Sequence, residues 1–183
     1  MTMRRAIVVM GVSGSGKSSV GAALAASLAI PFVDADSLHA PESIARMAAG
    51  LPLTDDDRWP WLSRVGTHLA DTVTYPRGIV IACSSLKRAY RDRIRAGAGR
   101  TVAFVFLDIE PETVHTRLAM RKDHFMPASL IESQFATLEN PSADEKDVLR
   151  LAVTRGVEEI AGLAWIALCK RGTDEGTGQE TSR

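Results

Sequence analysis

The residues best suited to chemistry stand near the start of the chain, in the segment GVSGSGKSS at 11–19. Gly11, Gly16, Lys17 and Ser18 fit the pattern G-x-x-x-x-G-K-[ST] without a mismatch. In such a loop, glycines let backbone N–H groups turn towards an anion. The lysine reaches the β- and γ-phosphates, and the hydroxyl that follows it ligates Mg²⁺. The pattern therefore predicts a site for a nucleoside triphosphate with Mg²⁺.

The flanking segments support this interpretation over a chance match in a glycine-rich turn. The apolar run AIVVM (6–10) precedes the loop, and the alanine-rich run at 18–29 follows it. A strand before the loop and a helix after it are the required context, and the helix would point its positive end at the same anion. We expect the nucleotide to be held by the following residues: Gly11, Ser13, Gly14, Ser15, Gly16, Lys17, Ser18, Ser19, Arg117 and Arg121.

Two carboxylates, Asp34 and Asp36, stand at the end of a second strand-like run, PFVDAD. At the carboxyl edge of a parallel sheet they would lie beside the phosphate loop. Phosphoryl transfer needs one carboxylate near the Mg²⁺ shell and one that orients or deprotonates the acceptor hydroxyl. We assign Asp34 to Mg²⁺ through water, with Ser18 as a direct ligand, and Asp36 to the acceptor. The alternative is that one of them only caps the next helix.

The elements that must position these residues form a regular alternation along the chain. Strand-like apolar runs stand at 6–10, 31–36, 78–85, 101–109 and 148–153. Helical patterns, about seven in all, include 18–29, 41–49, 58–75, 86–97, 110–121, a start near 127 and 157–171. Apolar strands that alternate with helices indicate a parallel sheet covered on both faces. We predict an α/β fold, a three-layer α/β/α sandwich with a five-stranded parallel sheet, as one domain at 1–171 with a disordered tail at 172–183.

The composition excludes several classes of protein. The 183 residues carry 22 basic and 22 acidic side chains, so no net charge draws the protein to nucleic acid or to an anionic membrane. No apolar run is long enough to span a membrane. Cys83 and Cys169 form neither a disulfide framework nor a C-x-x-C metal motif. We expect a cytoplasmic protein that acts on a small molecule.

A phosphate loop alone leaves switches, motors and small-molecule kinases open. The chain has no guanine-reading N-K-x-D motif and is short for a motor. Asp108, in VAFVFLD, resembles the carboxylate that ligates Mg²⁺ in many ATPases. The continuation DIEPETV also resembles an acidic helix start, which is the interpretation we favour.

Longer segments resemble the gluconate kinases, P-loop kinases close to the shikimate kinases within the nucleoside-monophosphate-kinase-like fold. The segments are GVSGSGKSSVG, DADSLH, MAAGLPLTDDDRWPWL, CSSLKRAYRDRIR, RKDHFM, SQFATLENP and DE at 144–145. They run from residue 7 to about 146. The first is shared by many kinases, and the combination of GLPLTDDDRWPWL, SLKRAYRD and HFM…SQFATLE is far more diagnostic. The resemblance implies ATP- and Mg²⁺-dependent phosphorylation of D-gluconate to 6-phospho-D-gluconate, and it suggests a homodimer.

Gluconate has one carboxylate and a chain of hydroxyl groups, so it requires cations at one end and hydrogen-bonding groups along the rest. The substrate-binding candidates are Asp36, His39, Arg58, Ser84, Lys87, Arg91, His124 and Gln134. Of Arg88, Arg91, Arg93 and Arg95, which share one helix, we expect one or two to matter and the others to be solvated. Trp59 and Trp61 are better explained by packing than by stacking on substrate.

Kinases of this fold carry a mobile lid where this chain has the basic segment RLAMRKDHFMPASLIESQF. We place the lid at about 121–133, with Arg121 as a catalytic residue beside Lys17 and Asp36. A lid arginine that stabilises charge on the transferring phosphoryl group is worth about 10³ to 10⁵ in rate, and closure excludes water. An ordinary surface cluster of charges is the alternative.

The chain departs from the family pattern at Ser43 (usually Asn), Ser85 (usually Ala) and Asp123 (usually Gly). Asp123 would stiffen the lid and add a negative charge near the phosphates. Two rival functions remain: a kinase for another small molecule such as shikimate, and a nucleotide-dependent sensor with little turnover. The HFM and SLKRAYRD strings argue against the first. Intact Asp36, Arg58 and Arg121 argue against the second.

Overall fold

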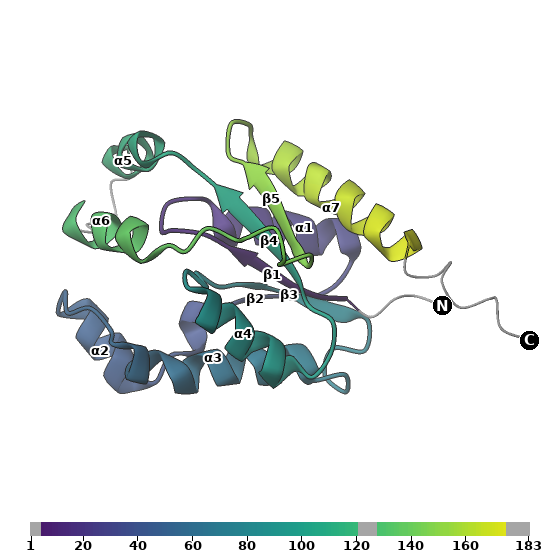
Figure 1. Ribbon diagram of the computed structural model, residues 1–183, viewed down its shortest axis with the longest axis horizontal. Coiled ribbons are helices and arrows are strands. Elements are labelled where there is room, and N and C mark those ends of the chain that lie inside the picture. The colour runs from purple at the N-terminus through teal and green to yellow at the C-terminus, as the bar shows by residue number, and fades with distance from the viewer. Residues whose placement is uncertain (1–4, 121–127, 175–183) are drawn as a thin grey trace, which may run out of the picture.

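A parallel sheet lies at the centre of the molecule in the computed structural model, which describes residues 5–120 and 128–174 (Figure 1). Its strands are β1 (Arg5–Met10), β2 (Phe32–Asp34), β3 (Gly78–Ala82), β4 (Ala103–Asp108) and β5 (Val148–Ala152). Their order is β2-β3-β1-β4-β5, and every pairing is parallel. The predicted five-stranded parallel sheet is confirmed.

Helices cover both faces of this sheet. The helices are α1 (Lys17–Leu28), the 3₁₀ helix η1 (Ala35–Leu38), α2 (Pro41–Ala48), α3 (Asp55–Ala70), α4 (Arg88–Ala98), α5 (Pro111–Ala119), α6 (Ala128–Thr137) and α7 (Val157–Asp174). α1 and α7 lie on one face, and α3 and α4 lie on the other (Figure 1). The architecture is the expected three-layer sandwich. None of the described helices is long and apolar enough to cross a membrane.

The central strand β1 shows why these runs are apolar throughout. Ile7 and Val9 belong to the core under α1 and α7, whereas Val8 and Met10 belong to the core under α3 and α4. Successive side chains of a strand point to opposite faces, so a strand covered on both sides has no solvent-facing position. On the second face α3 and α4 come very close, because a Cβ added to Gly66 would lie 2.8 Å from the Cα of Gly97.

The helices α3 and α7 differ from the sequence prediction by three or more residues at their ends. α3 begins at Asp55, three residues earlier than predicted, because Thr54 forms a capping box with Asp57. The helix ends at Ala70 rather than at 75. α7 continues to Asp174, three residues beyond the predicted end of the domain at 171.

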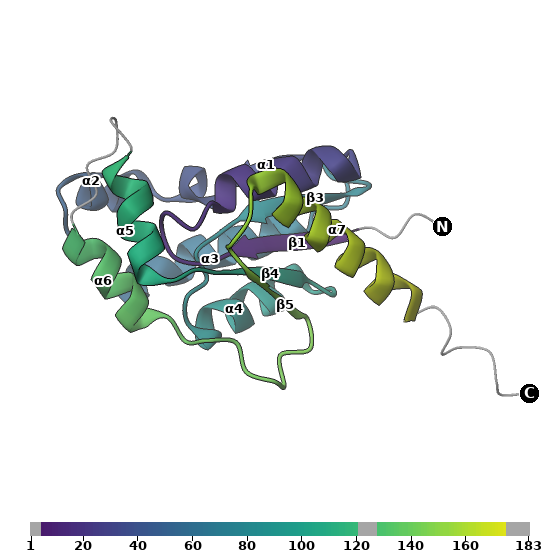
Figure 2. The ribbon, with the colours of Figure 1, turned by 90° about the horizontal axis from the view of Figure 1, so that it is seen from above.

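The carboxyl ends of the strands meet at one edge of the sheet, and this edge carries the predicted chemistry. Gly11 follows β1, Asp34 ends β2, and Ser84 follows β3. α2, α5 and α6 gather beyond this edge (Figure 2). Ligands of open α/β sheets bind at this position.

Candidate functional site

The phosphate loop has the backbone shape that its glycines predict. Gly11, Gly14 and Gly16 have φ values of 143°, 79° and 99°, in a region that residues with a Cβ seldom adopt. A Cβ on Gly11 would also lie 2.9 Å from the backbone oxygen of Leu107. Gly16 is the residue directly before α1, so the positive end of that helix opens into the loop.

Lys17 is held inside the loop between carbonyl and carboxylate oxygens. Its Nζ donates to the backbone oxygen of Val12 at 3.0 Å. Burial lowers the pKa of Lys17, while the nearby carboxylates of Asp36 and Asp34 raise it in opposition. A cation held against these acids suits a site where phosphate charge arrives.

The residues predicted to serve the metal lie in direct contact. Ser18 Oγ donates to Asp34 Oδ2 at 2.6 Å, and Asp34 Oδ1 accepts from the backbone N–H of Asp36 at 3.1 Å. Asp34 thereby caps the 3₁₀ helix η1 as well. Asp34 therefore caps the helix, and its second oxygen remains on Ser18. Both side chains offer hard oxygen donors of the kind that Mg²⁺ takes.

A cavity of about 230 Å³ opens beside the phosphate loop. It brings together seven of the predicted residues: Ser13, Lys17, Asp36, His39, Arg58, Ser84 and Gln134. Apolar side chains of Met47, Leu51 and Leu53 line another part of its wall. An anionic polyol could place its charged end and its hydroxyl groups on the polar side chains of this cavity.

The protonation of two cavity residues is set by their surroundings. Burial raises the pKa of Asp36, and so does the charge of Asp34, whereas Lys17 lowers it. Burial lowers the pKa of His39 to about 4, with Arg64 and Arg58 adding to the effect. His39 is therefore a neutral imidazole near pH 7.

His39 is also fixed in place. Its ring stacks on Trp61 with centroids 4.2 Å apart and 13° between the planes. Trp61 is 3% exposed and donates its indole N–H to the backbone oxygen of Ala35 at 2.6 Å. The Nδ1 atom of His39 is buried without a hydrogen-bond partner among the described residues. Trp59 packs edge-on against Tyr90 at 5.5 Å, so both tryptophans pack as predicted.

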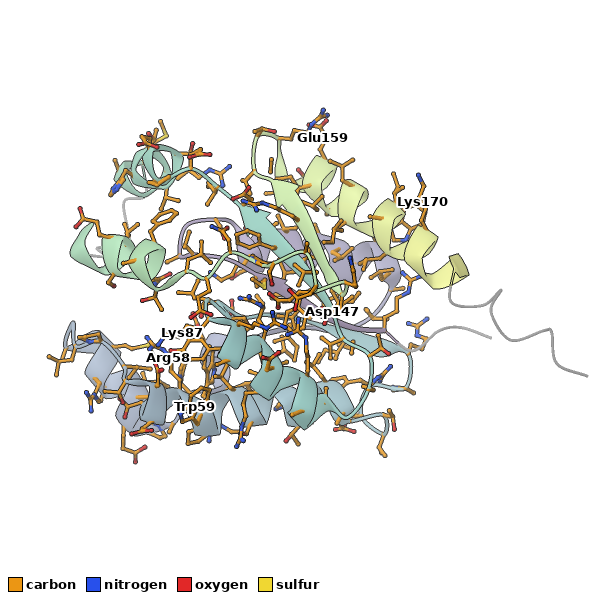
Figure 3. The ribbon with its side chains drawn as sticks, in the orientation of Figure 1. Arg58, Trp59, Lys87, Asp147, Glu159 and Lys170 are labelled. Atoms are coloured by element: carbon orange, nitrogen blue, oxygen red, sulfur yellow. The ribbon has the colours of Figure 1, made fainter. Side chains whose placement is uncertain are left out.

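Arg58 and Lys87 lie close together at the start of α3 and α4 (Figure 3) and share one carboxylate. Lys87 Nζ donates to both oxygens of Asp55, at 2.8 and 3.0 Å. Arg58 Nη1 lies 3.8 Å from Asp55 Oδ1 and donates to Tyr90 Oη at 3.2 Å. Tyr90 in turn donates to Asp55. Of these two cations, only Arg58 lines the cavity. Lys87 contacts the same Asp55 carboxylate and does not line the cavity.

Comparisons with known proteins show the family to which the chain belongs. A family model described as an AAA domain matches residues 7–141. The chain is 42% identical to the thermosensitive gluconokinase of Escherichia coli (strain K12), over 84% of this chain and 81% of that protein. It is 46% identical to the gluconokinase of Gluconobacter oxydans (strain 621H), over 77% and 79%. The chain belongs to the gluconokinase family. The crystal structure of a gluconokinase from Sinorhizobium meliloti 1021 matches with a TM-score of 0.88, at 42% identity, over 98% of this chain and 100% of that chain.

The predicted resemblance to the gluconate kinases is thus confirmed. Shikimate kinase from Aquifex aeolicus vf5 matches with a TM-score of 0.56 at 19% identity, over 91% of this chain and 98% of that chain. That match shows a shared fold alone.

Arg91 needs a correction, because the structure gives it another role than substrate binding. Its side chain is 1% exposed and pairs with Glu145 at 2.6 and 2.7 Å. Its Nη1 also donates to the backbone oxygens of Ser85, Leu86 and Glu139. This guanidinium is buried on protein acceptors and does not line the cavity, so it is not placed to bind a substrate there.

Of the other arginines of α4, Arg88 and Arg93 are exposed, as expected for solvated side chains, and Arg93 donates to Ser63 Oγ. Arg95 bonds Asp147, Glu145 and Asp92, and Arg88 bonds Asp144. The acidic segment at 144–147, which includes the DE of the family pattern, is therefore the partner of this basic helix.

Two long-range contacts tie α5 and α6 to the phosphate loop. Arg117 Nη1 donates to the backbone oxygen of Ser15 at 3.3 Å. Gln134 Oε1 accepts from the backbone N–H of Ser13 at 2.7 Å. Arg121, Asp123 and His124 lie outside the described residues, and the last six positions of the predicted lid belong to α6.

Three further positions can be compared with their predictions. Asp108, which lies three residues before the start of α5 at Pro111, accepts a hydrogen bond from Arg150 Nε at 2.8 Å. α5 begins at Pro111 with Glu112 in its first turn, which agrees with an acidic helix start. Ser85 is fully buried at a φ of 46°, and its Oγ has no hydrogen-bond partner among the described residues.

The sequence interpretation missed Asp55 and Tyr90. The signal for Asp55 was present, because it stands three residues before Arg58 at the start of a capped helix, where i,i+3 pairs face each other. Nothing local marked Tyr90, whose partners are 32 and 35 residues away.

Proposed function

We propose that this protein transfers the γ-phosphoryl group of ATP to D-gluconate, which gives 6-phospho-D-gluconate and ADP. The observation that carries the proposal is the cavity that joins Lys17 of the phosphate loop to Asp36, His39 and Arg58. The names of relatives at 39–46% identity support the choice of acceptor.

The phosphates would be held by Lys17 and by backbone N–H groups of the loop at 12–18, at the amino end of α1. The N–H groups of Ser13 and Ser15 already donate to Gln134 Oε1 and to the oxygen of Val12. Mg²⁺, when bound, neutralises charge on the β- and γ-phosphates. Ser18 would be its direct ligand, and Asp34 would hold it through water. Mg²⁺ keeps several waters in most protein sites, so one direct protein ligand and one carboxylate that acts through water fit this ion.

The acceptor would lie in the cavity with its reacting hydroxyl on Asp36. As the new O–P bond forms, the proton of this hydroxyl passes to the Asp36 carboxylate, and the bond from the γ-phosphorus to the ADP oxygen breaks. The raised pKa of Asp36 makes it a better proton acceptor than an exposed carboxylate.

The remaining groups of gluconate would meet the cations and the neutral polar groups. Arg58 would bind the carboxylate, with Lys87 behind it as a second positive charge. Nδ1 of the neutral His39 and the side chain of Ser84 would bond hydroxyl groups. We also assign His124 to the substrate, and Arg121 and Arg117 to the phosphoryl group. The lid at about 121–133, a cytoplasmic location and a homodimer remain predictions.

The test is an assay of ADP release with Mg²⁺ and ATP and a panel of acceptors: gluconate, other sugar acids, shikimate and none. We expect release that depends on gluconate. Asp36→Asn should lower kcat by about 10²- to 10⁴-fold, the usual value of general acid–base catalysis, while ATP binding persists. Asp56→Asn, at an exposed position in the first turn of α3, is the matched control. Folded protein that binds ATP and shows no gluconate-dependent release would refute the proposal.

A further inference from the structure

The phosphate loop and the cavity share one side chain, Gln134 of α6. Its Oε1 accepts a hydrogen bond from the backbone N–H of Ser13, 121 residues away in the sequence. Ser13 and Gln134 both line the cavity that contains Lys17 and Asp36. One carboxamide is therefore in contact with the loop for the nucleotide and with the space for the acceptor.

The contact with Ser13 fixes which way the carboxamide points. A backbone N–H can only donate, so the oxygen of the carboxamide must face it. The Nε2 group, with its two N–H donors, is then turned away from Ser13. The structure records no hydrogen-bond partner for Nε2 among the described residues, and this end is the one available to a ligand oxygen in the cavity.

Two contacts, one within α6 and one just beyond its end, anchor the helix that carries Gln134. Ile131 of α6 is 2% exposed and belongs to the core under α1. Just past the helix, Glu139 donates its N–H to the backbone oxygen of Leu86 at 2.9 Å and accepts from the N–H of Arg88 at 2.7 Å. These contacts hold α6 from Ile131 onwards against the rest of the domain, so the carboxamide of Gln134 is positioned without a large entropy cost on binding.

We propose that Gln134 couples the two substrate sites, so that ATP and gluconate each strengthen the binding of the other. Nε2 donates to a hydroxyl oxygen of the acceptor while Oε1 stays on Ser13. A ligand oxygen on Nε2 polarises the carboxamide, which makes Oε1 a stronger acceptor for the Ser13 N–H. In return, bound phosphates order the loop and so fix the position of the Ser13 N–H that Oε1 binds. Such a coupling is reciprocal by thermodynamic necessity.

The donor on Nε2 also complements Asp36. With Asp36 accepting the proton of the reacting hydroxyl, a lone pair of the same oxygen remains open for a donor. Two fixed partners on one hydroxyl set its direction as well as its position. This role rests on the proposed function, because it requires a hydroxyl acceptor in the cavity.

The experiment measures the dissociation constant of gluconate by calorimetry, with and without a non-hydrolysable ATP analogue and Mg²⁺. Gln134→Met removes both hydrogen bonds at nearly the same length, and Gln134→Glu keeps the acceptor for Ser13 and removes the donor. Glu132→Gln, at an exposed position of the same helix, is the control. We expect the analogue to tighten gluconate binding in the wild type and in the control. In both Gln134 variants this gain should shrink by about two- to tenfold, the effect of one hydrogen bond.

The outcomes separate this inference from the proposed function. Equal coupling in the wild type and both folded Gln134 variants would overturn the inference and leave the function intact. A wild type that binds gluconate and shows no coupling would do the same. A wild type that binds no gluconate would overturn both. A second readout is the Ser13 amide proton in NMR spectra, whose exchange should accelerate in Gln134→Met and remain slow in Glu132→Gln.

Discussion

The buried ion pair between Arg91 and Glu145 permits the most quantitative prediction. The two side chains are 1% and 2% exposed and are joined by bonds of 2.6 and 2.7 Å. Arg95 Nη2 adds a third bond to Glu145 at 2.9 Å. Glu145→Gln keeps the shape of the side chain and removes its charge, so Arg91 is left as a buried cation without an anionic partner.

The size of the effect follows from two separate arguments. Hydrogen bonds from Arg91, and then from Arg95, lower the pKa of Glu145 from 4.5 to about 2, against the opposing effect of burial. At about 1.4 kcal/mol per pKa unit this corresponds to about 3 kcal/mol. Breaking a buried ion pair by removing one partner costs about 3–5 kcal/mol in other proteins. For a domain of this size, roughly 2–4 °C per kcal/mol predicts a fall in Tm of roughly 6–12 °C.

The assay is urea unfolding of the wild type and Glu145→Gln across pH. The folded pKa is lowered, so the contribution of Glu145 is complete above pH 4.5 and is lost as the pH falls towards 2. The difference between the two proteins should therefore be about 3 kcal/mol at pH 7 and shrink below pH 4.5. Glu159, labelled in Figure 3, forms an exposed pair with Arg155, and Glu159→Gln should cost less than about 1 kcal/mol. A difference for Glu145→Gln that is this small at pH 7, or that does not depend on pH, would refute the reasoning.

Three further predictions concern the cavity. If Asp36 is the base, kcat/KM for gluconate should fall at low pH with a midpoint above 3.8, because burial raises its pKa; the residual activity of Asp36→Asn should lack this limb. His39→Phe keeps the stack on Trp61 and removes Nδ1, so KM for gluconate should rise by about two- to tenfold with no change in pH dependence between pH 5.5 and 8. Asp55→Asn releases Arg58 from its shared anion, and KM should rise while kcat stays within about twofold because Asp55 contacts no reacting atom. A fall in kcat without a change in KM would contradict this last role.

The sheet and the phosphate loop could be predicted because their signals are local. β1 is apolar at every position after Arg5, and a strand of this kind has few alternatives besides the centre of a parallel sheet. The loop that follows needs only its own glycines, a lysine and a hydroxyl residue. Asp34 and Ser18 were expected to lie near one another because the end of β2 and the start of α1 meet at the same edge of the sheet, although their direct hydrogen bond was not predicted.

The roles of the arginines could not be predicted, because their partners are remote in the sequence. Arg58 and Arg91 both stand on helices within segments typical of the family. One lines the cavity, and the other faces Glu145, which is 54 residues away. Helix periodicity says which residues share a face and does not say what covers that face. The opposite charges of α4 and the segment at 144–147 were the one available clue.

The cost of burying Arg91 and Glu145 raises the question of what the pair does for the protein. A buried ion pair can often be replaced by apolar side chains without loss of stability, so stability alone does not explain it. An apolar side chain could not satisfy the three backbone oxygens that Arg91 Nη1 binds, those of Ser85, Leu86 and Glu139. Ser85 follows the cavity residue Ser84, and Glu139 follows the helix that carries Gln134. The Arg91–Glu145 pair therefore holds two walls of the cavity at a fixed separation. In this way the Arg91 guanidinium helps to set the shape of the cavity although it does not contact the substrate.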